Sequence, residues 1–87
     1  MMTLDKRRKY LIACLAEECG EATQMAGKCL RFGIDSYHKK TGNISNMELL
    51  RREVNDIIAV AEMLNIDRNE EDIVAKQAKV AKWMYTE

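Results

Sequence analysis

Residues 4–32 have the sequence LDKRRKYLIACLAEECGEATQMAGKCLRF. Its apolar side chains recur at steps of three, four or seven residues, a spacing that places them on one face of an α-helix. We therefore expect one long amphipathic helix that ends near Phe32. Its apolar row comprises Leu4, Leu11, Leu15, Ala22, Ala26 and Cys29.

Two further helices are expected downstream. Residues 33–43 interrupt the periodicity with two glycines and a Thr-Gly-Asn turn signal, which predicts a loop. Ser45 and Glu48 have the spacing of a capping box, so a second helix should begin there. Asp67 and Glu70 repeat this spacing and predict the start of a third helix. The buried side of that helix would consist of Ile73, Val74, Ala78, Val80, Ala81 and Met84.

The composition is typical of a single all-α domain over residues 1–87. Apolar residues make up 47% of the chain and aromatic residues only 6%, and there is no proline, which favours helices packed through aliphatic side chains. Acidic and basic residues are balanced at 14 each, so the net charge points to neither a nucleic acid nor a membrane as partner. The three cysteines include no C-x-x-C pair, and we expect them to be small core residues.

The expected location is the cytoplasm. The apolar runs are too short to span a bilayer, and the N-terminal segment lacks the apolar core of a signal peptide. The cysteine pattern is also that of a reducing compartment, because it offers no disulfide framework.

Two pairs of acids interrupt the apolar rows. Glu18 and Glu21 lie three residues apart on the first helix, and Glu53 and Asp56 repeat that spacing on the second. Side chains three apart on a helix are neighbours, so antiparallel packing would make the two pairs face each other. Facing carboxylates need cations or protons, and oxygen ligands suit Mg²⁺, Mn²⁺ or Ca²⁺ better than zinc or copper. A ferritin-like di-iron centre would need Glu-x-x-His, whereas the only histidine, His38, falls in the loop.

These acids form part of a recognisable pattern. Glu17-Glu18-Cys19-Gly20-Glu21 followed by Glu53-Val54-Asn55-Asp56 resembles the E-E-x-x-E … E-x-x-D signature of MazG-like all-α nucleoside triphosphate pyrophosphohydrolases. The segment between the two acidic blocks is somewhat longer than in the usual signature. The resemblance implies a three-helix antiparallel unit that oligomerises into a four-helix-bundle-type assembly, as a homodimer or homotetramer. The compact size resembles phage-encoded members, which would act in the cytoplasm of their host.

The resemblance also implies a reaction: Mg²⁺-dependent cleavage of a (deoxy)nucleoside triphosphate to a monophosphate and pyrophosphate, with Mn²⁺ as a substitute ion. Glu17 would orient or deprotonate the attacking water. The implied metal ligands are Glu18, Glu21, Glu53 and Asp56, which with Glu17 make up the candidate catalytic residues. The candidate phosphate-binding residues are Lys28, Arg31, Asn55, Lys76 and Lys79, the last two suited to reach a neighbouring subunit.

Recognition of the base would depend on the loop around Phe32, Ser36 and Tyr37, and dGTP is one candidate substrate. Three short helices leave one side of a helical layer uncovered, and small domains often need partners to complete a core. Trp83, Tyr85 and the methionines are therefore expected at a subunit interface, with packing in the core of one chain as the alternative for Trp83.

Two other functions are compatible with the sequence. The acids could be surface charge, solvated or paired with Arg51, Arg52 or Lys28, in a non-catalytic helical oligomerisation or regulatory module. The basic run at residues 6–9 and the loop lysines could bind nucleic acid, but there is no basic excess and no recognition motif.

Overall fold

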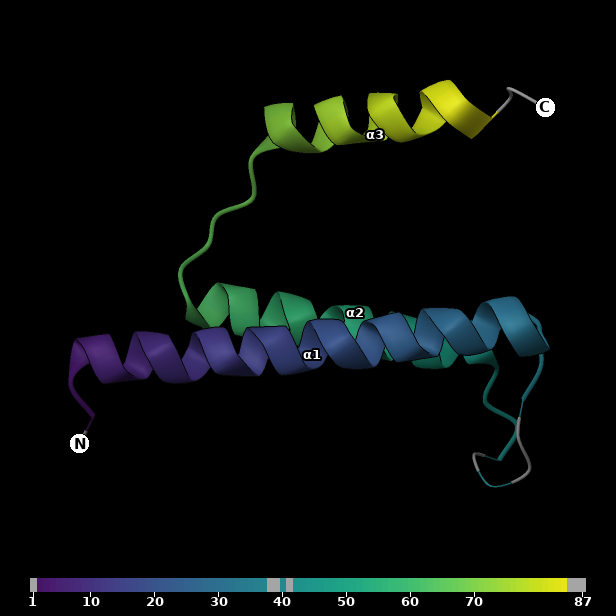
Figure 1. Ribbon diagram of the computed structural model, residues 1–87, viewed down its shortest axis with the longest axis horizontal. Coiled ribbons are helices and arrows are strands. Elements are labelled where there is room, and N and C mark those ends of the chain that lie inside the picture. The colour runs from purple at the N-terminus through teal and green to yellow at the C-terminus, as the bar shows by residue number, and fades with distance from the viewer. Residues whose placement is uncertain (1, 38–39, 41, 85–87) are drawn as a thin grey trace.

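The computed structural model describes residues 2–37, 40 and 42–84. These residues form three helices and no strand: α1 spans Leu4–Phe32, α2 spans Asn46–Met63 and α3 spans Glu70–Met84 (Figure 1). The expected all-α class is confirmed. None of these helices is both long and apolar enough to cross a membrane. His38 and Tyr85, singled out in the sequence, lie outside the described part of the chain.

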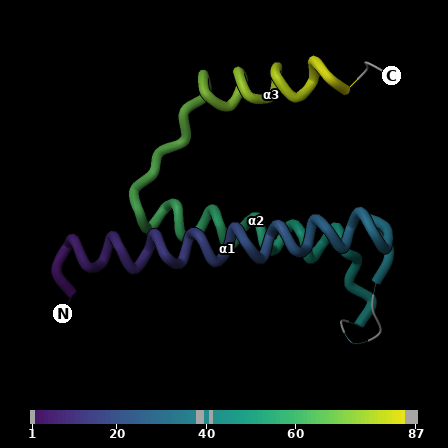
Figure 2. Tube along the Cα trace, viewed as in Figure 1, coloured from purple at the N-terminus to yellow at the C-terminus, as the bar shows by residue number. Residues whose placement is uncertain are grey.

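α1 and α2 run antiparallel and pack side by side (Figure 2). The buried apolar side chains are Leu11, Met25 and Cys29, all on α1. On α2 only Asn46, at the first turn, is buried to a similar degree. The core of the described chain is therefore small and confined to the seam between these two helices.

Side-chain caps fix where α2 and α3 begin. Ser45 caps α2 as expected, because its Oγ accepts a hydrogen bond from the backbone N–H of Glu48 at 3.1 Å. The cap expected at Asp67 is wrong. Asn69 caps α3 instead, with its Oδ1 accepting from the N–H of Asp72 at 3.0 Å. The later start gives α3 three acids in its first turn, where the helix dipole favours them.

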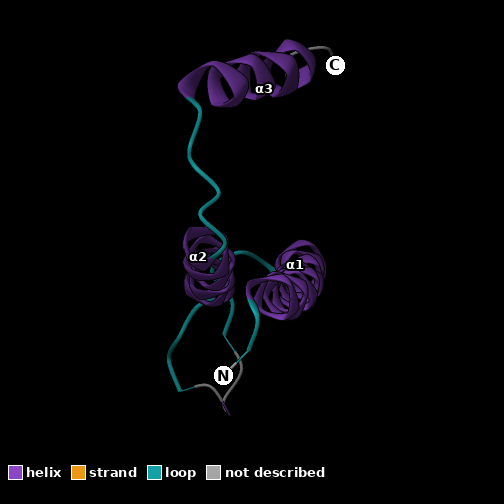
Figure 3. Cartoon of the chain, turned by 90° about the vertical axis from the view of Figure 1, so that its left-hand side faces the viewer, coloured by secondary structure: helices purple, strands orange, loops and turns teal. Residues whose placement is uncertain are grey.

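α3 stands apart from the other two helices (Figure 3). Among the described residues it makes no contact with α1 or α2. At the end of α2, Asn65 adopts a left-handed φ of 59°, and the N–H of Ile66 donates to the carbonyl of Ala61 at 3.0 Å. This is the Schellman arrangement, which ends a helix and redirects the chain. The three-helix antiparallel unit expected from the sequence is therefore wrong for one chain, in which only α1 and α2 pair.

Several side chains expected in a core are exposed. No residue of α3 is buried, although a whole apolar side was expected there. Trp83 is 67% exposed, so it does not occupy the core of its own chain. Cys29 is buried as expected, but Cys19 is exposed, and Leu4 is exposed at the start of α1.

The loop after α1 is tied back to the first turn of α2. The backbone N–H of Asn46 donates to the carbonyl of Ser36 at 2.8 Å, and its Nδ2 donates to the carbonyl of Gly33 at 2.9 Å. Gly33 has a φ of 108°, and a Cβ at this position would lie 2.7 Å from Oγ of Ser36. That hydroxyl is itself held by the carbonyl of Phe32 at 2.6 Å. Glycine is therefore required where α1 turns toward α2.

Replacing Gly33 should destabilise this junction. Gly33→Ala places a Cβ in a backbone region that only glycine adopts readily and against a fixed hydroxyl, so the free energy of unfolding should fall by about 1–3 kcal/mol. Gly20→Ala is the control, because Gly20 is helical with no atom within 4 Å of an added Cβ. It should raise the free energy of unfolding by about 0.5–1 kcal/mol. Urea unfolding followed by circular dichroism measures both; equal stability of Gly33→Ala and the parent would contradict the account.

Candidate functional site

Three of the expected carboxylates meet between α1 and α2. One oxygen each from Glu18, Glu53 and Asp56 lie within 4.8 Å of one another. Glu18 comes from the middle of α1, and the other two project from consecutive turns of α2. Glu18 and Glu53 are half-buried at the seam, whereas Asp56 is exposed beside it.

Glu21 and Glu17 border this group. Glu21, nearly one turn after Glu18, raises the pKa of both Glu18 and Glu53, mainly by charge repulsion. Glu17 is exposed and acts on Glu18 only through charge. We call Glu17, Glu18, Glu21, Glu53 and Asp56 the carboxylate cluster.

Crowding raises the pKa of two members of the cluster. For both Glu18 and Glu53, loss of hydration is the largest cause of the raised pKa, followed by repulsion from Glu21 and then from Asp56. Oε2 of Glu18 and Oε2 of Glu53 are buried and have no hydrogen-bond partner among the described residues. A buried carboxylate oxygen without a donor is unfavourable, so each position calls for a proton or a cation.

Nearby side-chain cations do not meet this need. Nε of Arg51 donates to the carboxylate of Glu48 at 2.8 Å, and Nε of Arg52 lies 3.6 Å from the same group. Lys28 lowers the pKa of Glu53, but its influence is the smallest of those acting there. Pairing with the two arginines therefore does not explain the cluster.

The donor set fits a hard divalent cation. Around octahedral Mg²⁺ with metal–oxygen distances of about 2.1 Å, ligand oxygens lie roughly 3.0 to 4.2 Å apart. The three converging oxygens, all within 4.8 Å of one another, need only a small contraction to reach that geometry. All donors are carboxylates, which Mg²⁺ and Mn²⁺ prefer. The unpartnered oxygens of Glu18 and Glu53 are then the atoms that an ion would satisfy.

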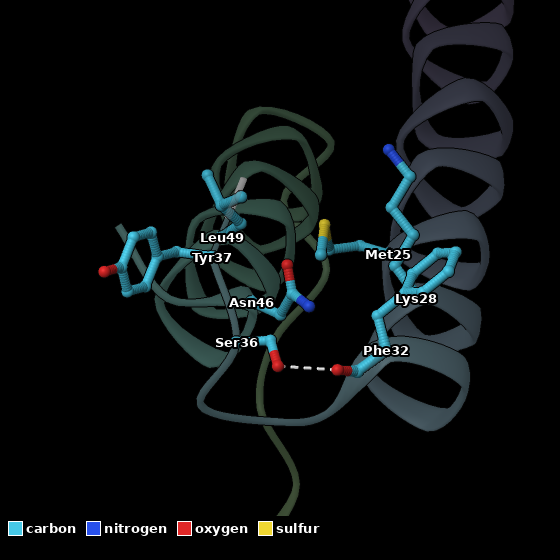
Figure 4. Close-up of a pocket in the computed structure, with 7 residues that line it drawn as sticks. All are labelled: Met25, Lys28, Phe32, Ser36, Tyr37, Asn46 and Leu49. Atoms are coloured by element: carbon cyan, nitrogen blue, oxygen red, sulfur yellow. Dashed lines mark hydrogen bonds between the residues drawn. The ribbon is translucent and has the colours of Figure 1, made fainter. Parts of the chain in front are cut away.

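A pocket of about 490 Å³ lies toward the C-terminal end of α1 and the first turn of α2 (Figure 4). Figure 4 shows Lys28 beside this pocket with its ammonium group directed back along α1. The lining residues are Met25, Lys28, Phe32, Ser36, Tyr37, Asn46 and Leu49.

Helical spacing joins the pocket to the cluster. Along α1, successive steps of three and four lead from Glu18 through Glu21, Met25 and Lys28 to Phe32. Along α2, the same steps link Asn46, Leu49, Glu53 and Asp56. Both rows face one side of the α1–α2 pair, which we call the site face. The sequence-based reasoning missed Met25, Asn46 and Leu49, and this alternation of steps is the signal that could have found them.

The other expected phosphate-binding residues are not brought to the site face by this chain. Arg31 is exposed, with its guanidinium 5.3 Å from the centroid of the Phe32 ring. Asn55 is exposed, and because it follows inward-facing Glu53 by two residues it lies on the far side of α2 from α1. Lys76 and Lys79 belong to α3, which contacts neither α1 nor α2.

The raised pKa values predict how stability depends on pH in the absence of divalent cations. Because the folded-state pKa of Glu18 and Glu53 exceeds the ordinary 4.5, their stabilising contribution is fully present below that value and is lost as pH rises through the raised pKa. In EDTA, the melting temperature should therefore be higher at about pH 5 than at about pH 7. The Glu18→Gln/Glu53→Gln double variant should lose this difference, whereas Glu62→Gln, an exposed acid on α2, should keep it. An unaltered pH dependence in the double variant would count against the account.

Comparison with known proteins identifies no relative of this chain. No family model, no curated protein and no solved structure matches the chain. The function has therefore to be inferred from the side chains that the fold brings together, and the resemblance in the acidic motifs remains a hypothesis.

Proposed function

We propose that this chain is a Mg²⁺-dependent nucleoside triphosphate pyrophosphohydrolase. The observation that carries the proposal is the convergence of Glu18, Glu53 and Asp56 across the α1–α2 seam, with two buried oxygens that have no donor. Perturbed acids gathered beside a pocket are typical of functional sites rather than of solvated surface charge. The acidic motifs, which resemble the MazG-like signature, favour the same reaction.

The cluster divides into groups with different tasks. Glu18, Glu53 and Asp56 would hold the Mg²⁺, with Glu21 in position to join them. When bound, Mg²⁺ neutralises phosphate charge and lowers the barrier to in-line attack by water. Glu17 lies exposed at the rim, where its carboxylate can orient a water molecule and accept its proton.

Lys28 links the cluster to the pocket. Its ammonium group acts on Glu53, and its side chain also lines the pocket. A triphosphate chain that extended from the pocket to the cluster would pass this ammonium group. Lys28 is therefore the phosphate-binding residue that a single chain can supply.

The pocket suits a flat heterocycle. Its volume of about 490 Å³ falls within the range of small-molecule sites, and Phe32 and Tyr37 offer aromatic faces for stacking. Ser36 and Asn46 add polar groups that can contact the edge of a base. We propose the base of a (deoxy)nucleotide as occupant, with dGTP as one candidate and the phosphates directed toward the cluster.

The exposed apolar side chains of α3 favour a second candidate, a non-catalytic helical oligomerisation or regulatory module. This role predicts assembly without turnover. Both candidate functions would be carried out by a homodimer or homotetramer. They differ in whether the carboxylate cluster acts on a nucleotide.

Product analysis tests the proposal. The protein is incubated with a panel of ribo- and deoxynucleoside triphosphates and with inorganic tripolyphosphate, in Mg²⁺, Mn²⁺ or EDTA, and the products are separated by ion-exchange chromatography. We expect monophosphate and pyrophosphate from a nucleoside triphosphate with either metal and none in EDTA. Tripolyphosphate, which cannot use the pocket, should have a higher KM. Release of orthophosphate and a diphosphate would contradict the proposed bond, and no turnover of any substrate would favour the non-catalytic module.

Cluster variants locate the chemistry in the same assay. Glu53→Gln and Asp56→Asn should each lower kcat by at least about 100-fold, the scale of a lost metal contact. Their helical circular dichroism should persist, because removing a charge relieves repulsion within the cluster. Glu62→Gln, which removes an exposed acid from the same helix, should retain the parent activity. Parent-like kcat in both cluster variants would place the reaction elsewhere.

A further inference from the structure

Asn46 is the one polar side chain that is buried in the described part of the chain. It is only 8% exposed, and it lines the pocket from the first turn of α2. One N–H of its Nδ2 donates to the carbonyl of Gly33 at 2.9 Å. Because a carbonyl oxygen can only accept, this bond fixes which way the amide points and turns Oδ1 away from the loop. Figure 4 shows Oδ1 on the side of Met25, away from Ser36.

The hydrogen-bond donors around this amide are already engaged. The hydroxyl of Ser36 donates to the carbonyl of Phe32 at 2.6 Å. The backbone N–H of Gly33 donates to the carbonyl of Cys29 at 3.0 Å, and that of Asn46 donates to the carbonyl of Ser36 at 2.8 Å. A ligand at this end of the pocket therefore meets mainly acceptors, which are Oδ1 of Asn46 and the lone pairs of Ser36 Oγ.

The other polar groups of the pocket point elsewhere. Figure 4 shows the hydroxyl of Tyr37 directed away from Asn46, and the ammonium group of Lys28 directed back along α1. The remaining lining residues are apolar: Met25, Phe32 and Leu49. A carbonyl group of a ligand would thus meet acceptors at the polar end of the pocket and hydrocarbon elsewhere.

We propose that Asn46 selects a base that carries an exocyclic amino group over the corresponding base with a carbonyl group or a hydrogen at that position. The inference rests on the proposed function, since it takes the pocket to hold the base. An amino group brings two N–H donors, one for Oδ1 of Asn46 and one for a second acceptor such as Oγ of Ser36. A carbonyl group would instead set acceptors against each other where Asn46 is shielded from water.

Binding of nucleoside monophosphates in EDTA tests this preference without any turnover. Isothermal titration calorimetry compares three pairs: cytidine with uridine, adenosine with inosine, and guanosine with inosine monophosphate. In the pair that binds best, the member with the amino group should have a Kd at least about 10-fold lower, the scale of one unmet buried hydrogen bond. Equal binding within that pair, tighter binding of the member without the amino group, or no binding of any monophosphate would overturn the proposal.

A variant assigns the preference to the side chain. Asn46→Ala removes Oδ1 and should bring the ratio of the two Kd values close to one. Gln24→Ala is the matched control, because it removes an exposed side-chain amide from α1 and should keep the parent ratio. An unchanged ratio in Asn46→Ala would overturn the assignment.

A second measurement serves if Asn46→Ala unfolds, since this variant also loses the bond to Gly33. In the NMR spectrum of the parent protein, the side-chain amide resonance of Asn46 should shift on titration with the amino-bearing monophosphate. A resonance that stays in place, or that both members of the pair shift equally, would overturn the proposal. Because none of these readouts needs hydrolysis, a preference without turnover would contradict the enzymatic proposal alone, and turnover without a preference would contradict only the role of Asn46.

Discussion

The apolar contact between α1 and α2 holds the two helices together, and it sets Glu18 close to Glu53 across the seam. Buried side chains hold the helices together on both sides of this point, at Leu11 before it and at Met25 and Cys29 after it. The apolar contacts therefore bring like charges together that would separate if they were free to do so. An arrangement that is unfavourable when empty becomes favourable once a divalent cation lies between the carboxylates.

The two sides of the α1–α2 pair have different chemistry because each helix carries two adjacent rows. The site face combines acids, Lys28 and a pocket. The opposite side carries five exposed apolar side chains: Ile12, Leu30, Met47, Val54 and Ile58. The seam between α1 and α2 contains few buried side chains.

Local signals in the sequence predicted local structure well. The periodicity over residues 4–32 predicted α1 to its last residue, and Ser45 marked the start of α2, because both depend on neighbours within a few positions. The three-residue spacing of Glu53 and Asp56 predicted that they share a face, and antiparallel packing brought Glu18 to them. The packing of α3 against its own chain was predicted wrongly. An apolar row in the sequence indicates that a helix face tends to be buried, but it does not indicate which chain buries it. The hydrogen bond from Asn46 to the carbonyl of Gly33 was not predicted, because it joins residues thirteen positions apart across the loop.

Calorimetric titration of the protein with MgCl₂ measures directly whether the carboxylate cluster holds a divalent cation. We expect saturable uptake by the parent protein and by Glu62→Gln, and loss of that uptake in the Glu18→Gln/Glu53→Gln double variant with helicity retained. No uptake by the folded parent, or equal uptake by the double variant, would contradict this expectation.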